Sequence, residues 1–297
     1  MFRFLKKHWW GVLYSLFLTI FTAYTFMDTF LVSRVYVSVE ETKSTESEEN
    51  QTKAVVSENS YSDENIQITV TEYREEDTNV YVADITLSSP EYLQTALARN
   101  AYGKNVTAKT SETAESVHAI LAINGDYYGA QEAGYVIRGG VLYRDTAQEG
   151  QEDLVLYEDG TMGIISEDQV SAEELLEDGA KEVLSFGPAL ITQGEIAVEE
   201  DDEVGKAMAS NPRTAIGVID DLHYVFVVAD GRTEESEGLS LLELAEFMDT
   251  LGVTTAYNLD GGGSSTMYFN GALVNQPTTN GKTIEERSVS DIVYIGY

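Results

Sequence analysis

The N-terminal part of the chain places the strongest constraint on its fold. Residues 9–27 contain no charged side chain, and at about 1.5 Å of rise per residue a helix of that length spans roughly 28 Å, close to the hydrocarbon thickness of a bilayer. Three basic residues precede this run: Arg3, Lys6 and Lys7. Because basic residues mark the cytoplasmic side, we expect residues 1–8 in the cytoplasm, a transmembrane signal anchor at 9–27 and the rest of the chain outside the cell membrane.

A cleaved signal peptide is the alternative to an anchor. Such a peptide has an apolar region of about 7–15 residues followed by an A-x-A-like cleavage site. Here the apolar run is longer, and Ala23 lacks a matching small residue two positions away. We therefore predict an uncleaved anchor and a single-pass membrane protein.

The composition excludes several classes of function. The sequence has 51 acidic and 18 basic residues, a formal net charge of −33, and no cysteine. This charge argues against nucleic-acid binding, which needs clustered Lys and Arg against the phosphate backbone. Without cysteine the chain forms neither disulfides nor Cys-ligated metal sites. Since exported proteins of complex cells usually carry disulfides, the composition favours a bacterial source.

The chain beyond the anchor divides into a linker and one folded domain. Residues 28–60 include an acidic, Ser/Thr-rich stretch with few large apolar residues. A stretch of that kind buries too little surface to offset its ordering entropy, so we expect an extracytoplasmic stalk and linker. Residues 61–297 have the length of a single catalytic domain.

Strand patterns outnumber helix patterns in the domain. Alternating or continuous apolar runs predict strands, with a hairpin opening the domain, and 3.6-residue spacing predicts helices at 91–99, from Ser171 and at 240–251. The helix at 240–251 has a capping box, Ser240 with Glu243, and Gly252 as its stop. We predict an α+β fold with a mixed, mostly antiparallel sheet and a few packed helices. The expected strands are 66–70, 80–87, 117–123, 154–157, 162–165, 214–219, 223–229, 254–259, 266–269 and 288–297.

Four segments place polar residues directly after or before an apolar strand. Strand ends are where sites are usually built, because the sheet holds the side chains rigidly. Asp126, Asp230 and Arg213 can also be read as turn or surface residues. Asp260 is harder to read that way, because three consecutive glycines follow it and a hairpin needs only one or two. The four segments are residues 122–129 (AINGDYYG), 211–217 (NPRTAIG), 228–232 (VADGR) and 258–265 (NLDGGGSS).

Several familiar chemistries do not fit these segments. A P-loop needs Lys after its glycines, where this chain has Ser264. A Ser-His-Asp triad and a His-bound zinc site both lack a histidine at suitable spacing. We predict no metal and no cofactor, although an all-oxygen Ca²⁺ site stays open. The remaining chemistry is that of carboxylates beside arginines, which suits hydrolysis of a sugar bonded to phosphate. The candidates are Asp126, Asp230 and Asp260 with Arg138, Arg213 and Arg232.

At this point the sequence resembles a known family. The segments that carry the likeness are residues 122–144, 185–191 (SFGPALI), 211–217, 230–239, 257–267 (YNLDGGGSSTM) and 287–295 (RSVSDIVYI). In this order they resemble the phosphodiester glycosidase family, and in particular its bacterial members described as exopolysaccharide biosynthesis proteins. The likeness covers nearly all of residues 115–297. Where the family more often has Gly-Gly-Phe-Phe, this chain has Gly125-Asp126-Tyr127-Tyr128, so Asp126 is either catalytic or a branch-specific substrate contact.

The resemblance implies a hydrolase acting on a sugar-1-phosphodiester of the N-acetylglucosamine type. As a hypothesis, Asp260 and Asp230 form the carboxylate pair, with Asp126 as a third catalytic candidate, and Arg213 and Arg232 bind the phosphate. The glycine amides and the serine hydroxyls after Asp260 hold phosphate or sugar. The full set of expected substrate contacts is Asn124, Arg138, Arg213, Arg232, Asn258, Gly261, Gly262, Gly263, Ser264, Ser265, Arg287 and Asp291.

The expected partner is an extracellular polysaccharide or a teichoic-acid-like phosphodiester polymer. One rival hypothesis is open: a non-hydrolytic polysaccharide-binding or assembly module in exopolysaccharide export. Both hypotheses need the arginines and glycines, but only the enzyme needs Asp230 or Asp260 for turnover.

Overall fold

A nine-stranded antiparallel sheet organises the fold in the computed structural model, which describes residues 9–39, 54–199 and 210–297. Near one edge, the strand Ile66–Glu75 alternates buried and exposed positions in its first half, because one face of the sheet there meets the core. In spatial order the strands are β15 (Glu195–Ile196), β14 (Ala189–Thr192), β18 (Thr255–Asn258), β16 (Arg213–Asp220), β17 (His223–Ala229), β5 (Thr78–Leu87), β4 (Ile66–Glu75), β3 (Ser60–Ser62) and β2 (Val55–Val56).

Two five-stranded antiparallel sheets complete the domain. The first has the order β10 (Val141–Arg144), β9 (Val136–Arg138), β13 (Ala180–Leu184), β11 (Glu152–Tyr157) and β12 (Met162–Ser166). The second has the order β20 (Ala272–Leu273), β19 (Met267–Phe269), β8 (Leu121–Asn124), β21 (Asp291–Ile295) and β6 (Leu93–Leu97). The main hydrophobic core lies where the three sheets meet, with Phe226, Ile123 and Leu154 as one contribution from each.

Three short helices cover the outer faces of the sheets. α5 (Leu241–Thr250) packs on the far face of the nine-stranded sheet, α3 (Thr110–Ser116) on the sheet that contains β8, and α4 (Ala172–Glu177) on the sheet that contains β13. Because α5 covers one face and the main core the other, the central strands of the large sheet are buried on both sides. The expected α+β class with mostly antiparallel sheets is confirmed.

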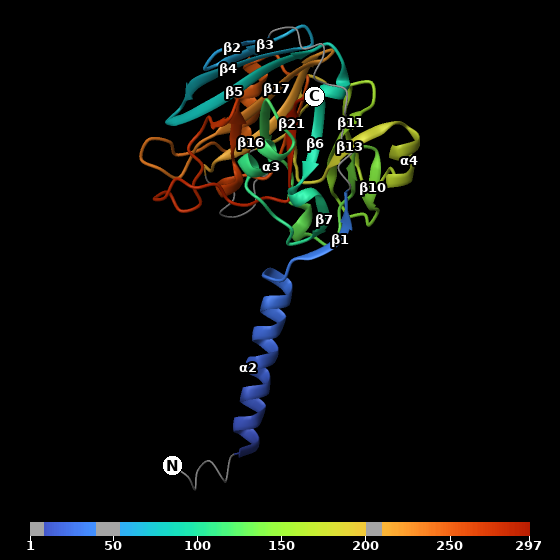
Figure 1. The fold of residues 1–297 in the computed structure, drawn as a ribbon, viewed down its shortest axis with the longest axis vertical. Helices are drawn as coiled ribbons and strands as arrows, with labels where there is room; N and C mark the ends of the chain where they lie inside the picture. The colour runs from blue at the N-terminus through green and yellow to red at the C-terminus, as the bar shows by residue number, and fades with distance from the viewer. Residues whose placement is uncertain (1–8, 40–53, 200–209) are drawn as a thin grey trace.

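The longest helix projects away from the domain. α2 (Trp9–Phe30) is long and apolar enough to cross a membrane, and none of its residues is buried. Figure 1 shows it leaving the domain beside β1 (Arg34–Ser38), which pairs with β7 (Ala101–Lys104) as a separate two-stranded sheet. The helix continues three residues beyond the predicted span of 9–27.

Local sequence signals identified many of these elements. The opening hairpin is β4 with β5, β11 and β12 form a second hairpin, and β16 pairs with β17. The predicted capping box of α5 forms, with the Ser240 hydroxyl accepting from the Glu243 amide. The helix α4 begins after Ser171 as predicted, and a capping box with Glu174 forms there too. The helix α5 also ends before Gly252, which has φ +78°.

The predicted helix at 91–99 is wrong, because residues 93–97 form strand β6 instead. Each residue of β6 pairs with a residue of β21, from Leu97 with Asp291 to Leu93 with Ile295. The apolar positions that gave helical spacing, Leu93 and Leu97 among them, are buried in this strand. Pairing with a strand near the C-terminus therefore overrides the local spacing.

The expected linker lies partly outside the described residues, which exclude 40–53. The described parts of 28–60 take part in sheets: β1 pairs with β7, and β2 pairs with β3 at the edge of the nine-stranded sheet. Sheet structure thus begins before Tyr61, where we had expected the domain to start.

One tyrosine hydroxyl links two of the sheets, and its removal tests how much that link contributes to stability. Tyr257 of β18 is fully buried; its hydroxyl donates to the Glu152 carbonyl (2.7 Å) and accepts from the Phe186 amide (2.8 Å). Tyr257→Phe leaves both groups without this partner, so we expect the free energy of unfolding to fall by about 1–3 kcal/mol. Chemical denaturation of the detergent-solubilised chain measures it, with Tyr73→Phe, an exposed tyrosine, as the matched control. Equal free energies of unfolding for the two variants would show that the Tyr257 hydroxyl does not stabilise the contact between the two sheets.

Candidate active site

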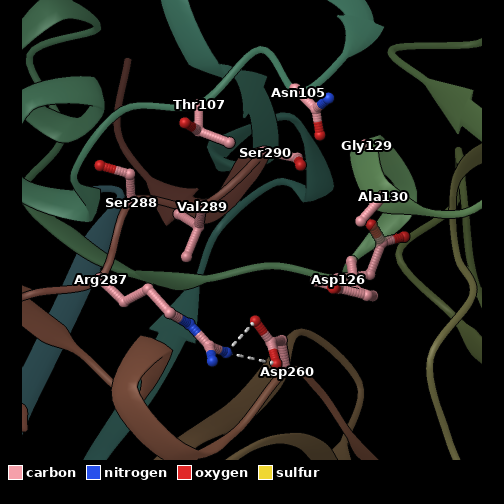
Figure 2. Close-up of a pocket in the computed structure, with 11 residues that line it drawn as sticks. Asn105, Thr107, Asp126, Gly129, Ala130, Asp260, Arg287, Ser288, Val289 and Ser290 are labelled. Carbon is pink, nitrogen blue, oxygen red and sulfur yellow. Dashed lines mark hydrogen bonds and ion pairs between the residues drawn. The ribbon is translucent and has the colours of Figure 1, made fainter. Parts of the chain in front are cut away.

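A cavity of about 150 Å³ lies where strand ends from two sheets meet. Figure 2 shows Asp126 and Asp260 among the residues around it, with Arg287 beside Asp260. The lining residues are Asn105, Thr107, Asp126, Tyr127, Gly129, Ala130, Asp260, Arg287, Ser288, Val289 and Ser290.

The topology explains why these residues meet. Asp126 follows the end of β8, and residues 287–290 precede the start of β21, its antiparallel neighbour. Asp260 follows the end of β18 in the nine-stranded sheet. The buried side chain of Asn124 joins the two sheets: its Nδ2 donates to the Asp260 carbonyl (2.6 Å), and its Oδ1 accepts from the Thr214 hydroxyl (2.8 Å). Asn124 is thus a positioning residue rather than a lining residue.

Asp260 belongs to a three-residue cluster at the cavity wall. Arg287 Nη2 donates to both carboxylate oxygens of Asp260 at 3.0 and 2.9 Å, and Arg287 Nε donates to the Ser264 hydroxyl at 2.7 Å. The Ser264 hydroxyl in turn donates to Asp260 Oδ2 at 2.6 Å. Asp260 is only 7% exposed, whereas the Arg287 side chain is 41% exposed. The carboxylate of Asp260 is therefore buried, whereas the side chain of the arginine that binds it is partly exposed to solvent.

Opposing effects set the protonation of Asp260. Burial raises its pKa above the ordinary range, Arg287 and the Ser264 hydroxyl lower it, and the charge of Asp126 raises it again. The net direction is upward, which makes Asp260 a better proton acceptor than an exposed aspartate.

Asp126 is held by a buried arginine. Arg138 Nη2 donates to Asp126 Oδ2 (2.8 Å) and to Asp291 Oδ2 (2.6 Å), and Arg138 Nε donates to Asp291 Oδ2 (2.9 Å). Burial lowers the pKa of Arg138, but the two carboxylates outweigh it and hold the pKa above its ordinary value. Burial, and then the charge of Asp126, raise the pKa of Asp291. Gly125 is required here because a Cβ would lie 2.3 Å from Asp291 Oδ1.

A further layer of acids lies behind Asp126. The Ser185 amide donates to Asp126 Oδ2 (3.1 Å), and the Ser185 hydroxyl donates to Glu167 (3.2 Å). Burial and the neighbouring Glu167 raise the pKa of Asp153, which is fully buried. These residues support the orientation of Asp126 without lining the cavity.

The glycines after Asp260 serve packing. Gly262 has φ +63° and donates its amide to the Pro212 carbonyl (2.8 Å). A Cβ on Gly263 would lie 2.2 Å from the Thr279 hydroxyl. The loop can therefore close against its neighbours only without side chains, and the Gly262 amide is already used within the protein.

Other predicted site residues lie elsewhere. The Asp230 carboxylate accepts from the Asn275 side chain (3.0 Å) and the Gln276 amide (3.0 Å), so it fixes that loop. Arg213 is buried and donates to the Leu239 carbonyl (2.8 Å).

Arg232 donates to the Thr279 carbonyl (2.8 Å) and to Asn211. None of the three residues Asp230, Arg213 and Arg232 lines the cavity, because their polar groups bond to neighbouring loops.

Two more candidates are buried beside the site. Asn258 donates to the Gly187 carbonyl (2.7 Å). The Ser265 hydroxyl has no hydrogen-bond partner among residues 9–39, 54–199 and 210–297. Of the predicted substrate contacts, only Arg287 lines the cavity, with Asp126 and Asp260 from the predicted catalytic set.

Sequence reasoning missed several lining residues. Ser288 and Ser290 lie within the recognised segment 287–295 but were not selected, and Tyr127 follows Asp126 directly. Asn105 had a weaker signal: it directly follows β7 and adopts φ +54°, a conformation that asparagine tolerates. Within the part of the chain that the structure describes, no group of three or more His, Cys, Asp or Glu side chains is placed to hold a metal ion.

Comparisons with known proteins agree with this architecture. The family model described as phosphodiester glycosidase matches residues 118–296. The chain is 31% identical to the bovine N-acetylglucosamine-1-phosphodiester alpha-N-acetylglucosaminidase over 58% of this chain and 35% of that protein. It is 29% identical to the SPbeta prophage-derived uncharacterized protein YomE of Bacillus subtilis over 62% of this chain and 29% of that protein. The chain thus spans about a third of the length of these curated relatives.

A solved structure shares the fold. The catalytic domain of the zebrafish N-acetylglucosamine-1-phosphodiester alpha-N-acetylglucosaminidase, auto-inhibited by its pro-peptide, superposes with a TM-score of 0.62 at 20% identity. The match covers 90% of this chain and 89% of that chain. A hypothetical protein from Synechocystis gives a TM-score of 0.60 at 15% identity, over 78% of this chain and 62% of that chain.

The contact between Arg287 and Asp260 leads to a prediction about the pKa of Asp260. Since Arg287 lowers the pKa of Asp260, Arg287→Gln should raise that pKa further. The measurement is a titration of the Asp260 carboxyl carbon by NMR in the detergent-solubilised chain. Arg232→Gln, which removes an arginine outside the cavity, is the matched control and should leave the titration unchanged. An unchanged pKa in Arg287→Gln would show that the two side chains do not interact in solution.

Proposed function

Because the chain belongs to the phosphodiester glycosidase family, we propose that it hydrolyses a sugar-1-phosphodiester, with Asp260 as the reacting carboxylate. The single observation that supports this most is the pairing of a buried carboxylate of raised pKa with a partly exposed arginine in one cavity. Relatives are named for N-acetylglucosamine-1-phosphodiester. A phosphodiester of N-acetylglucosamine is therefore the first substrate to test.

In the proposed reaction, Arg287 recognises the phosphate. Its Nε and Nη2 are engaged with Ser264 and Asp260, while Nη1 has no hydrogen bond to any described residue and belongs to an exposed guanidinium. A planar guanidinium suits phosphate oxygens, and a phosphate beside it would not displace the contact with Asp260. The Ser288 and Ser290 side chains line the same wall and supply hydroxyl donors.

Asp260 serves as the base in this proposal. Water adds to the anomeric carbon, and its proton passes to the Asp260 carboxylate. The bond between that carbon and the phosphate oxygen breaks, and its electron pair leaves with the phosphate monoester. Because a phosphate leaves readily near neutral pH, one carboxylate suffices and no separate acid is needed.

Tyr127 is proposed to bind the sugar, and Asp126 is proposed to position it. Arg138 and the Ser185 amide hold the buried Asp126 carboxylate in one orientation behind the cavity wall, which fixes the backbone that carries Tyr127. Tyr127 is 46% exposed at the same wall and offers an aromatic face with a polar tip. In this arrangement Asp126, rather than Asp230, lies at the same cavity as Asp260.

We further propose that the enzyme is anchored in the cell membrane with its domain outside. The apolar helix α2 and the basic residues that precede it support this topology. The polymer would be an exopolysaccharide or a teichoic-acid-like chain that carries sugar-1-phosphodiester groups. The binding-module hypothesis differs from this one in needing no reacting carboxylate.

The decisive variant is Asp260→Asn, which keeps the size of the side chain and removes its basicity. We expect kcat for release of N-acetylglucosamine from a soluble phosphodiester to fall at least about a hundredfold, while binding persists. Released sugar measures turnover, and isothermal titration calorimetry measures affinity.

Asp230→Asn is the matched comparison and should keep turnover within about threefold. Loss of turnover in Asp230→Asn with normal activity in Asp260→Asn would reverse the assignment. Binding by the wild-type chain without any release of sugar would favour the binding-module hypothesis.

A further inference from the structure

The helix α2 joins the domain through a very short connection. Three residues, Leu31 to Ser33, separate the end of α2 at Phe30 from the start of β1. β1 then pairs with β7, and Arg34 lies opposite Lys104. The direction of the helix is therefore tied to the domain by a sheet rather than by a free linker.

The end of the helix and the cavity share a residue. Asn105 follows β7 and lines the cavity. Its Nδ2 donates to the carbonyls of Thr29 (3.0 Å) and Val32 (3.3 Å), and its own carbonyl accepts from the Ser33 hydroxyl (2.7 Å). The cavity that contains Asp260 is thus separated from the last turn of α2 by one side chain.

The level of this junction matches the lipid headgroups. α2 has 22 residues, so at about 1.5 Å per residue it spans roughly 33 Å, enough to cross a hydrocarbon layer of about 30 Å. Phe30 then lies near the outer surface of that layer, where the phosphates of membrane lipids also lie. Asn105 lines the cavity and bonds to the end of α2, so the cavity lies next to this junction.

Apolar residues surround the junction on the surface. We define the junction patch as six side chains that are each at least 41% exposed: Phe30, Leu31, Val32, Val35, Val37 and Val39. Because the patch continues directly from α2, the hydrocarbon that surrounds the helix is the apolar partner nearest to it. Exposed apolar surface of this kind marks an interaction site more often than an isolated residue does.

A second, smaller cavity of about 90 Å³ lies between the β1–β7 pair and residues 128–132. Tyr36 of β1 and Tyr102 of β7 line it, with ring centroids 6.0 Å apart, and Tyr102 stacks on Tyr128 at 5.3 Å. Gly129 lines both this cavity and the one with Asp260. The cavity beside β1 and the cavity with Asp260 are therefore neighbours that share a lining residue.

We propose that the substrate is a lipid-linked sugar phosphodiester, held in the same bilayer as α2, in which the second ester of the phosphate is a long-chain alcohol. This inference rests on the proposed hydrolase function and specifies its substrate class. Hydrolysis by one water gives the free sugar in solution and the lipid monophosphate in the membrane. The tether confines enzyme and substrate to one surface, which raises their effective concentration.

The test compares two substrates of the full-length chain in lipid vesicles. One is N-acetylglucosamine-1-phosphate esterified to a long-chain prenol in the bilayer, and the other is its water-soluble methyl ester. At equal bulk concentration we expect the prenol ester to be hydrolysed at least about tenfold faster. Adding carrier lipid should lower the rate with the prenol ester in proportion to its surface dilution and leave the rate with the methyl ester unchanged.

Two pairs of matched variants locate the effect at the junction. A twenty-residue Gly-Ser insertion between Phe30 and Leu31 gives a flexible separation of about 25 Å and should remove most of the preference for the prenol ester. The same insertion placed before Trp9 should not. Val35→Ser with Val37→Ser should lower prenol-ester hydrolysis several-fold, whereas Val55→Ser with Val56→Ser, on exposed valines of the distant strand β2, should have no effect.

The outcomes separate this inference from the proposed function. If the methyl ester is hydrolysed as fast as the prenol ester, or the insertion after Phe30 leaves the preference intact, the lipid-linked substrate is rejected and the hydrolase stands. If the methyl ester is hydrolysed and the prenol ester is not, the lipid-linked substrate is likewise rejected and the hydrolase function stands. If neither ester is hydrolysed, the hydrolase function fails and this inference fails with it.

Discussion

The buried contact of Arg138 with Asp126 and Asp291 is the constraint on which the site depends. Arg138 comes from β9 in one five-stranded sheet, and Asp291 opens β21 in the other. A single guanidinium thus holds two sheets together at the point where the chain leaves β8 toward the cavity. Breaking a buried ion pair by removing one partner typically costs about 3–5 kcal/mol, because a charge is left without compensation. The position of Asp126 in the cavity is therefore inseparable from the packing of the sheets.

The two carboxylates of the cavity differ in how they are held. Asp126 is enclosed by Arg138 and by backbone amides, and its partners are buried. Asp260 is paired with Arg287, whose guanidinium reaches solvent. A phosphate that approached Arg287 would alter the field at Asp260 far more than at Asp126, because only the first pair is accessible. The structure thus combines one enclosed carboxylate with one whose arginine partner reaches solvent.

Local signals in the sequence predict the hairpins and the capped helices, because alternation and capping boxes act over a few residues. The glycine run also drew attention to Asp260, which lines the cavity. Local signals failed at residues 93–97, whose strand partner lies almost two hundred residues further along the chain. They also failed to separate Asp260 from Asp230 and Arg213. All three residues lie at the same end of neighbouring strands in the nine-stranded sheet, since Arg213 pairs with Ala229 and Ala215 pairs with Asn258. The loops that cover these strand ends decide which of the side chains lines the cavity; residues 275–276, for example, bind the Asp230 carboxylate. No local sequence pattern encodes the placement of such loops.

The pairing of β1 with β7 has a consequence for biogenesis. Ser33 and Asn105 are 72 positions apart in the sequence, and closing a loop of that size costs roughly 4 kcal/mol of chain entropy. In the proposed membrane topology, α2 enters the membrane first, and β1 waits at the surface until β7 has been delivered across it. The last step of folding would then draw the finished domain down onto its own N-terminal strand. A chain stalled before that step would have a folded core and an unpaired, valine-rich strand at the membrane surface, which is the state most exposed to quality-control proteases.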